Sequence, residues 1–394
     1  MIRPKILALA AVLGYASFLL AGPNSQWRVL PSPQSGVANY LFGVAGLSRT
    51  NLWAVGYSYD ANNRQLTLVE HWNGHAWAIV PSPNPGNENR CGSGYSGNQL
   101  NAVASVAPND VWAVGYACGY ESRTLVEHWN GKKWSVVASP NQPGAETSAL
   151  AGVVAISDTD VWAVGNYQLE GQYLWNTLVE HWDGTSWSIV NSPNINGADM
   201  NFLNGVAAVS ATDIWAVGYH ESSELPPYQL PLIEHYDGQQ WEVVASPAPP
   251  PSEYNALYGV VALAADNVWA VGYENEDTQG ENGTGLIEHW DGSQWNLVSN
   301  PVAGEANDLL SVAGGSENDI WAVGYVSDAD VQFSPITEHW DGQTWTVVRP
   351  PDPGVNGQLF GVVPVAGRFC AVGAYSTIHN PGYLEDPMTM IIAR

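Results

Sequence analysis

Residues 160–187 read DVWAVGNYQLEGQYLWNTLVEHWDGTSW, and near copies of this stretch recur along the chain. Within it, Trp-Ala-Val-Gly recurs roughly every 54 residues, which is the mark of a repeat architecture. The motif begins at Trp53, Trp112, Trp162, Trp215, Trp269 and Trp321. The chain is therefore a series of like units.

Each repeat contains four short segments, which we call strands a to d. They read like Leu-x-Gly-Val-Ala, Asp-Val-Trp-Ala-Val-Gly-Tyr, Thr-Leu-Val-Glu-His-Trp and Trp-Ser-Ile-Val-x-Ser-Pro. All are rich in β-branched and aromatic residues and are bounded by turn residues, so we expect strands. The Asn-Gly or Asp-Gly pair between strands c and d predicts a tight primed hairpin turn. Four antiparallel strands per repeat predict the blade of a β-propeller.

The two ends of the chain decide the predicted number of blades. A lone strand d begins at Trp27, whereas strands a, b and c beginning at Leu359, Phe369 and Met388 have no strand d after them. Six complete repeats and one split repeat predict an all-β, seven-bladed propeller over residues 23–394. Its N-terminal strand d would join the C-terminal strands a to c, which leaves no exposed sheet edge.

The repeat resembles those of secreted bacterial seven-bladed propeller proteins and, more distantly, kelch and sialidase Asp-box propellers. The Asp-box likeness lies in residues 181–187, HWDGTSW, while Val-Gly-Tyr stands where kelch repeats have a Gly-Gly doublet. The resemblance spans residues 27–394 and implies the architecture. It implies no single activity, because propellers carry hydrolases, oxidases, lectins and scaffolds alike.

The net charge and the N-terminal segment limit the cellular location of the protein and the kinds of partner that it can bind. The chain has 394 residues and a net charge of −26, which disfavours nucleic acid as a partner. A basic start followed by uncharged residues Ile6 to Gly22 predicts that residues 1–22 are a signal peptide or an uncleaved N-terminal anchor. We expect a secreted or cell-surface monomer that touches a membrane only through such an anchor.

The chain has three cysteines, an odd number for an exported protein. Cys91 and Cys118 fall in loops on the same face of the predicted propeller, so we expect a disulfide between them. Cys370 stands at the strand-b position that is tryptophan in the other repeats, which predicts a buried, inert thiol.

The recurring tryptophans and the Glu-His pairs are expected to be scaffold. A Glu and the His that follows it point to opposite faces of a strand, so they cannot converge on one ion, and no metal site is predicted. Each Glu should be satisfied by a hydroxyl, a backbone amide or a histidine. The Asp before each strand b, as in Asp110 or Asp160, is expected to cap a turn.

The connections from b to c and from d to a are long, so we expect the functional site on the face that carries them. The candidate ligand-binding residues are aromatic residues, together with two arginines that give a weak anion-site signal: Trp175, Tyr167, Tyr219, Tyr273, Tyr325, Arg90 and Arg123. No residue is assigned a catalytic role. No cofactor is expected, although acidic runs such as 274–277 and 328–330 leave calcium open.

Three functions remain open at this point. The favoured one is an extracellular binding module for a glycan or a protein. A sialidase-like glycoside hydrolase or lyase would need paired carboxylates at the ring centre. A structural cell-surface repeat protein would need no ligand at all. A deep pocket with convergent acids at the axial mouth would favour the enzyme, and a shallow aromatic surface would favour binding.

Overall fold

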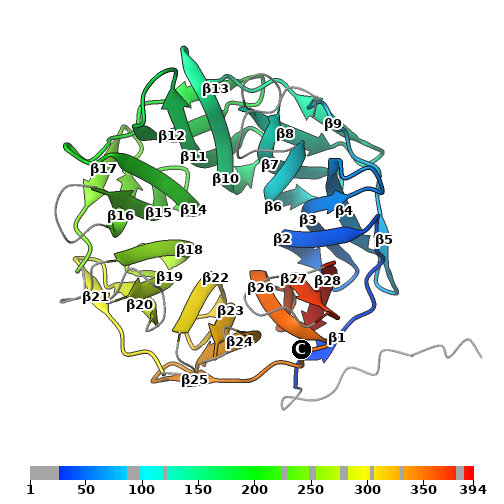
Figure 1. Cartoon of the computed structure of the whole chain (residues 1–394). Helices are drawn as coiled ribbons and strands as arrows, with labels where there is room; N and C mark the ends of the chain where they lie inside the picture. Colours follow the sequence, from blue (N-terminus) through cyan, green and yellow to red (C-terminus); the bar gives the residue numbers. More distant parts are fainter. Residues whose placement is uncertain are drawn as a thin grey trace, which may run out of the picture.

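A computed structural model describes residues 26–86, 97–118, 122–222, 229–247, 254–275, 283–301, 306–328, 332–378 and 386–394. These residues form β-strands joined by turns and loops, and none of them is helical. The strands stand in antiparallel sheets arranged around a ring (Figure 1). This arrangement confirms the predicted all-β propeller architecture.

The strands form three four-stranded sheets and two eight-stranded sheets, one of β6–β13 and one of β14–β21. Along the chain they follow one another as meanders of four antiparallel strands, each running from the inside of the ring outwards, and we name each such blade by its strands. The first three are β2 (Ala38–Ser48), β3 (Asn51–Tyr59), β4 (Gln65–Trp72), β5 (Trp77–Ile79); β6 (Asn98–Ala107), β7 (Asp110–Cys118), β8 (Ser122–Trp129), β9 (Trp134–Val137); and β10 (Ala145–Ser157), β11 (Asp160–Leu169), β12 (Trp175–Trp182), β13 (Trp187–Val190). The next three are β14 (Met200–Ser210), β15 (Asp213–Glu221), β16 (Gln229–Tyr236), β17 (Trp241–Val244); β18 (Tyr254–Ala264), β19 (Asn267–Asn275), β20 (Thr284–Trp290), β21 (Trp295–Leu297); and β22 (Ala306–Ser316), β23 (Asp319–Ser327), β24 (Phe333–Trp340), β25 (Trp345–Val347).

The last sheet is built from both ends of the described chain. It contains β26 (Val355–Pro364), β27 (Phe369–Ser376), β28 (Met388–Ala393) and, as its outer strand, β1 (Arg28–Val29). Arg28 pairs with Ala393 and Val29 with Ile392 in antiparallel register. The N-terminal strand therefore closes the ring against the C-terminal strand, as the split repeat predicts.

The turns between the two outer strands differ from the prediction. Trp72 pairs with Trp77, so four residues separate the paired positions. Gly74 has a φ of 93°, whereas Asn73 is not among the described residues with positive φ. A primed two-residue turn of the Asn-Gly type needs positive φ at both residues. Instead, the Asn73 side-chain oxygen accepts hydrogen bonds from the backbone N–H groups of His75 and Ala76 at 2.9 and 3.1 Å.

Hydrophobic cores lie between neighbouring blades. Leu100 and Trp134 of one blade pack with Trp53 and Val55 of the blade before it, and all four are buried. The innermost strands approach closely: a Cβ added to Gly43 would lie 2.9 Å from the Cα of Ala102 in the next blade. A residue larger than glycine at this position would push two blades apart.

Residues 1–22, the predicted signal peptide or anchor, lie outside the described residues. In the part of the chain that the structure does describe, no helix is present that is long and apolar enough to cross a membrane.

Candidate functional site

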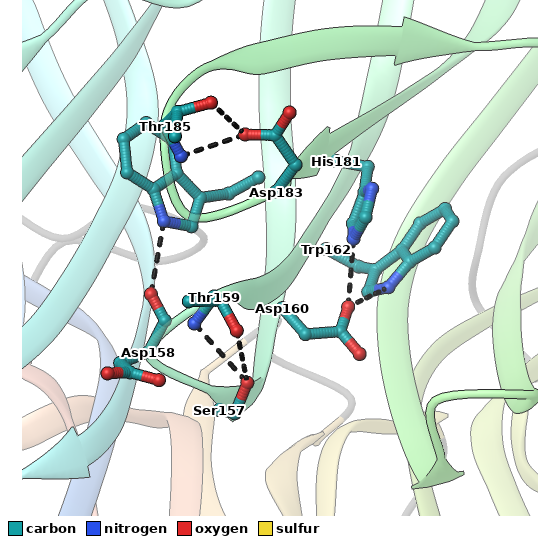
Figure 2. Close-up of polar contacts among 9 residues, drawn as sticks. Ser157, Asp158, Thr159, Asp160, Trp162, His181, Asp183 and Thr185 are labelled. Carbon is teal, nitrogen blue, oxygen red and sulfur yellow. Dashed lines mark hydrogen bonds and ion pairs between the residues drawn. The ribbon is translucent and has the colours of Figure 1, made fainter.

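The recurring Asp, Trp and His form a network at the short-turn end of the ring, seen for one blade in Figure 2. Asp160 Oδ1 lies 2.8 Å from His181 Nε2 and accepts a 2.8 Å hydrogen bond from the indole N–H of Trp162. The His181 ring stacks on Trp162 at a centroid distance of 4.2 Å. The aspartate therefore orients two side chains rather than capping the turn as predicted. Equivalent networks recur, for example at Asp213 and Asp319, and each one joins the second and third strands of its own blade.

The glutamates of the Glu-His pairs are fully buried between blades. Ser192, which follows the outer strand of one blade, donates a 2.7 Å hydrogen bond to Glu234 of the next blade. Ser246 donates in the same way to Glu288 at 2.8 Å. The expected hydroxyl partner is thus found, and it comes from the preceding blade.

The blade closed by the N-terminal strand lacks both the glutamate and the serine of this hydrogen bond. Ile392 replaces the glutamate in β28, as its pairing with Ala371 shows. The preceding blade has Pro350 at the serine position. Both members of the hydrogen bond are therefore absent together, which avoids an unsatisfied buried polar group. Blade β18–β21 has Asn300 at the serine position, and the glutamate of the blade after it, Glu338, instead accepts a 3.1 Å hydrogen bond from Asn307.

Burial raises the pKa of these carboxyl groups strongly. It raises the pKa to about 8 for Glu70, Glu127, Glu180 and Glu234 and to about 7 for Glu288 and Glu338. The two oxygens of Glu127 have no hydrogen-bond partner within the described residues. A protonated carboxyl avoids the cost of an unpaired buried charge.

A different surface lies at the opposite end, where the innermost strands begin and their partners end, and where the long connections attach. We call it the inner rim. Its side chains are partly exposed and belong to several blades: Tyr40, Phe42, Tyr57, Gln99, Asn101, Phe202, Tyr219, Tyr258, Tyr273, Asp308, Tyr325 and Phe360. The rim is mainly aromatic.

A stack of aromatic rings leads from Trp175, which we include in the inner rim, to Phe202 and Tyr219. Trp175, at the first position of β12, stacks on Phe202 of the next blade at 5.5 Å, and Phe202 stacks on Tyr219 at 4.9 Å. The backbone N–H of Trp175 is held by the carbonyl of Asp199 at 3.0 Å. The predicted candidates Trp175 and Tyr219 are therefore brought together by a residue that the sequence analysis did not single out.

The stack is followed by a tyrosine cluster. Tyr258 stacks on Tyr273 at 5.9 Å. Tyr325 donates a hydrogen bond to Asp308. Burial, together with the nearby Tyr273, Tyr219 and Asp308, raises the pKa of Tyr258 well above its ordinary value. The predicted candidates Tyr219, Tyr273 and Tyr325 thus converge around Tyr258.

The blade β6–β9 contributes amide groups to the inner rim. Gln99 accepts a 3.1 Å hydrogen bond from the hydroxyl of Tyr116 and donates a 2.6 Å hydrogen bond to Asn101. The Gln65 amide of the preceding blade donates to Gln99 at 3.0 Å. These amide groups can donate hydrogen bonds to a polar ligand and accept hydrogen bonds from it.

Carboxylates are scarce on the innermost strands at this end. Each innermost strand has a buried leucine, and we consider the residue before it and the residue after it. At these positions Asp308 is the one acidic residue, and none is Lys or Arg. The residues are Tyr40, Phe42, Gln99, Asn101, Ala149, Ala151, Phe202, Asn204, Ala256, Tyr258, Asp308, Leu310, Gln358 and Phe360. These fourteen positions therefore supply one carboxylate, Asp308. A second acidic side chain at this end, Glu221 at the end of β15, lies near Asp199 and Tyr273.

Tyr167 lies apart from the inner-rim tyrosines. Tyr167 pairs with Ser148. Counted from the tryptophan of its repeat, it stands one position later along the strand than the inner-rim tyrosines, and Asn166 takes the position equivalent to theirs. Since neighbouring residues of a strand point to opposite faces, Tyr167 turns to the preceding blade and packs against the core that contains Trp112 and Leu150. Counting from Trp162 would have shown this shift.

The remaining predicted residues are placed as follows. Arg123 is exposed on β8. Arg90 and Cys91 lie outside the described residues. Cys118 is buried at the end of β7, and Cys370 is a buried, free thiol. The Cys91–Cys118 disulfide stays a prediction.

Calcium also stays a prediction, because parts of both acidic runs lie outside the described residues. Elsewhere in the described chain, no group of three or more His, Cys, Asp or Glu side chains is placed to hold a metal ion.

Comparison with known proteins supports the fold. No family model matches the chain, and no curated protein matches it either. Among solved structures, YCF48 bound to D1 peptide is similar with a TM-score of 0.52 at 14% identity, over 94% of this chain and 96% of that one. A catalytically inactive virginiamycin B lyase from Staphylococcus aureus with Quinupristin has a TM-score of 0.57 at 11% identity, over 94% and 99%. At these identities the likeness shows a shared β-propeller fold.

Proposed function

We propose that this protein is an exported binding module whose inner rim holds an extended peptide segment of an extracellular partner. The observation that carries the proposal is the partly exposed aromatic surface that runs from Trp175 through Phe202 and Tyr219 to the cluster around Tyr258. Aromatic faces pack on apolar groups, while their hydroxyls and the amides of Gln99 serve peptide N–H and C=O groups.

Two further points support binding over hydrolysis and peptide over sugar. A hydrolase with an acid/base pair needs two convergent carboxylates, and the innermost strands supply Asp308 alone at the flanking positions. YCF48, which shares the fold, is bound to a peptide in its solved structure. Sugar rings also stack on aromatic side chains, so a glycan is the competing ligand class in the test.

The finer architecture belongs to the same proposal. Each eight-stranded sheet is joined at its middle by one parallel pair of residues, Thr147 with Ser122 and Tyr254 with Gln229. Dividing the sheets at these single bridges gives blades of four strands and supports a count of seven. Export rests on residues 1–22, and the free state of Cys370 supports a disulfide between Cys91 and Cys118.

The test is a screen of the full chain against a peptide library and a glycan array. The matched variants are Trp175→Ala, which removes the first ring of the stack, and Tyr173→Ala, which removes an aromatic side chain that is 91% exposed. We expect peptide ligands whose binding is lost in the first variant and kept in the second. Binding confined to glycans would change the ligand class, and ligands that bind both variants equally would refute the inner rim as the site.

A further inference from the structure

The boundary between the split blade and blade β2–β5 differs from the other boundaries. Elsewhere, a tryptophan of the second strand packs against two aromatic residues of the next blade, as Trp53 does with Trp129 at 4.9 Å and Trp134 at 5.3 Å. In the split blade this tryptophan is Cys370, and the histidine that would stack on it is Ala393, which pairs with Cys370.

A cavity of about 360 Å³ lies at this boundary. Its walls include Cys370 and Ala393 on one side and Trp72 and Trp77 of the next blade on the other. The cavity therefore occupies the region where the other boundaries hold an indole and an imidazole. Its volume is in the range of small-molecule sites, roughly 300–1,000 Å³.

The same cavity concentrates positive charge in a strongly acidic protein. Of the 12 Lys and Arg residues in the chain, Arg28, Arg49, Arg368 and Arg394 line it, and no Asp or Glu side chain does. The guanidinium of Arg394 lies 4.2 Å from the ring centre of Trp321, which directs it to the neighbouring boundary.

Of the other three arginines, Arg49 and Arg368 lie in the turns between the first two strands of their blades, at the short-turn end, and Arg28 lies on β1. Arg49 donates a 2.6 Å hydrogen bond to the carbonyl of Ala366, which fixes its position across the boundary. Burial and the nearby Arg49 and Arg28 lower the pKa of Arg368. Like charges gathered around one cavity favour an anion there.

We propose that this cavity is a second binding site, for a small planar aromatic carboxylate. The aromatic ring would lie between Cys370 and Trp72, in the place that tryptophan fills at the other boundaries. The carboxylate would face Arg28, Arg49 and Arg368. The site is at the opposite end of the ring from the inner rim, so it does not depend on the peptide-binding proposal.

The probe is indole-3-acetate, titrated into the full chain by calorimetry, with indole and tryptamine as its neutral and cationic counterparts. We expect saturable one-to-one binding of indole-3-acetate, at least about tenfold weaker binding of indole, and weaker binding still of tryptamine, because arginine–carboxylate hydrogen bonds are charge-assisted. Absence of binding by indole-3-acetate, or equal affinity for the three probes, would refute the proposal.

Two variants locate the site. Cys370→Trp restores the residue of the other boundaries and should abolish binding while leaving the ring folded. Arg28→Ala removes an exposed arginine and should weaken indole-3-acetate binding without affecting indole, whereas the control Lys132→Ala, at the short-turn end of another blade, should change neither. Unchanged binding in both Cys370→Trp and Arg28→Ala would show that the probe binds elsewhere and overturn the assignment.

Discussion

Replacing Glu127 with glutamine tests whether the buried glutamates make stability depend on pH. Glu127 is fully buried on β8, its carboxylate oxygens have no hydrogen-bond partner in the described part of the chain, and burial raises its pKa from 4.5 to about 8. In the unfolded chain the group ionises around pH 4.5, while in the folded protein it stays protonated until about pH 8.

The sign of the effect follows from this difference. Between pH 4.5 and about 8 the folded state holds a proton that the unfolded state has lost, so stability falls as the pH rises. The slope is about 1.4 kcal/mol per pH unit for one such group, with an upper limit of about 5 kcal/mol over the whole interval. The contribution of Glu127 to the stability of the fold is most favourable below pH 4.5, is lost between pH 4.5 and about 8, and is constant at higher pH.

The assay is urea unfolding of the wild type and Glu127→Gln at pH 5 and pH 8. Glutamine does not titrate, so the variant should gain stability relative to the wild type between these pH values by about 2–4 kcal/mol. Glu242→Gln is the control, because Glu242 is solvent-exposed on β17. If the difference between Glu127→Gln and the wild type is the same at both pH values, the folded protein does not keep Glu127 protonated, and the reasoning fails.

Three further outcomes are expected. Trp27→Ala should cost about 3–5 kcal/mol by removing an indole that is 4% exposed in the closing sheet, whereas Val29→Ala at a 40% exposed position should cost far less in thermal unfolding; equal losses would contradict the closure. Asp160→Asn keeps an oxygen for His181 and should cost under about 1 kcal/mol, whereas Asp160→Ala should cost about 1–3 kcal/mol in the same assay; a milder effect of alanine would refute the network. Burial raises the pKa of Cys370 to about 12, so at pH 8 its thiol stays protonated and should react with a thiol reagent much more slowly in the folded protein than after unfolding, even though it lines the cavity; equal rates before and after unfolding would contradict this pKa.

The sequence by itself determined the strands and the way the ring closes. Repeated alternation of β-branched and aromatic residues defines each strand locally, without knowledge of its neighbours. The lone strand that begins at Trp27 lacks a blade, and the strand that begins at Met388 lacks an outer partner, so their pairing follows from the need to satisfy both edges.

The tertiary structure decided which residues meet, because the cores and hydrogen bonds of this fold form between blades. Ser192 and Glu234 lie 42 positions apart, and only the packing of one blade on the next makes them partners. Phe202 and Tyr219 are register partners within one blade, and the packing of the preceding blade is what places Trp175 on Phe202. Tyr167 shows the reverse case, since one step along a strand carries it from the inner rim to the interior.

The cavity between the split blade and blade β2–β5 depends on both the sequence and the tertiary structure. The sequence shows that Cys370 replaces a tryptophan, which suggests only a buried thiol. The structure sets that substitution opposite Trp72 and beside arginines from both ends of the chain. The cavity and its positive charge arise where the surfaces of two blades meet, so they cannot be read from any single repeat of the sequence.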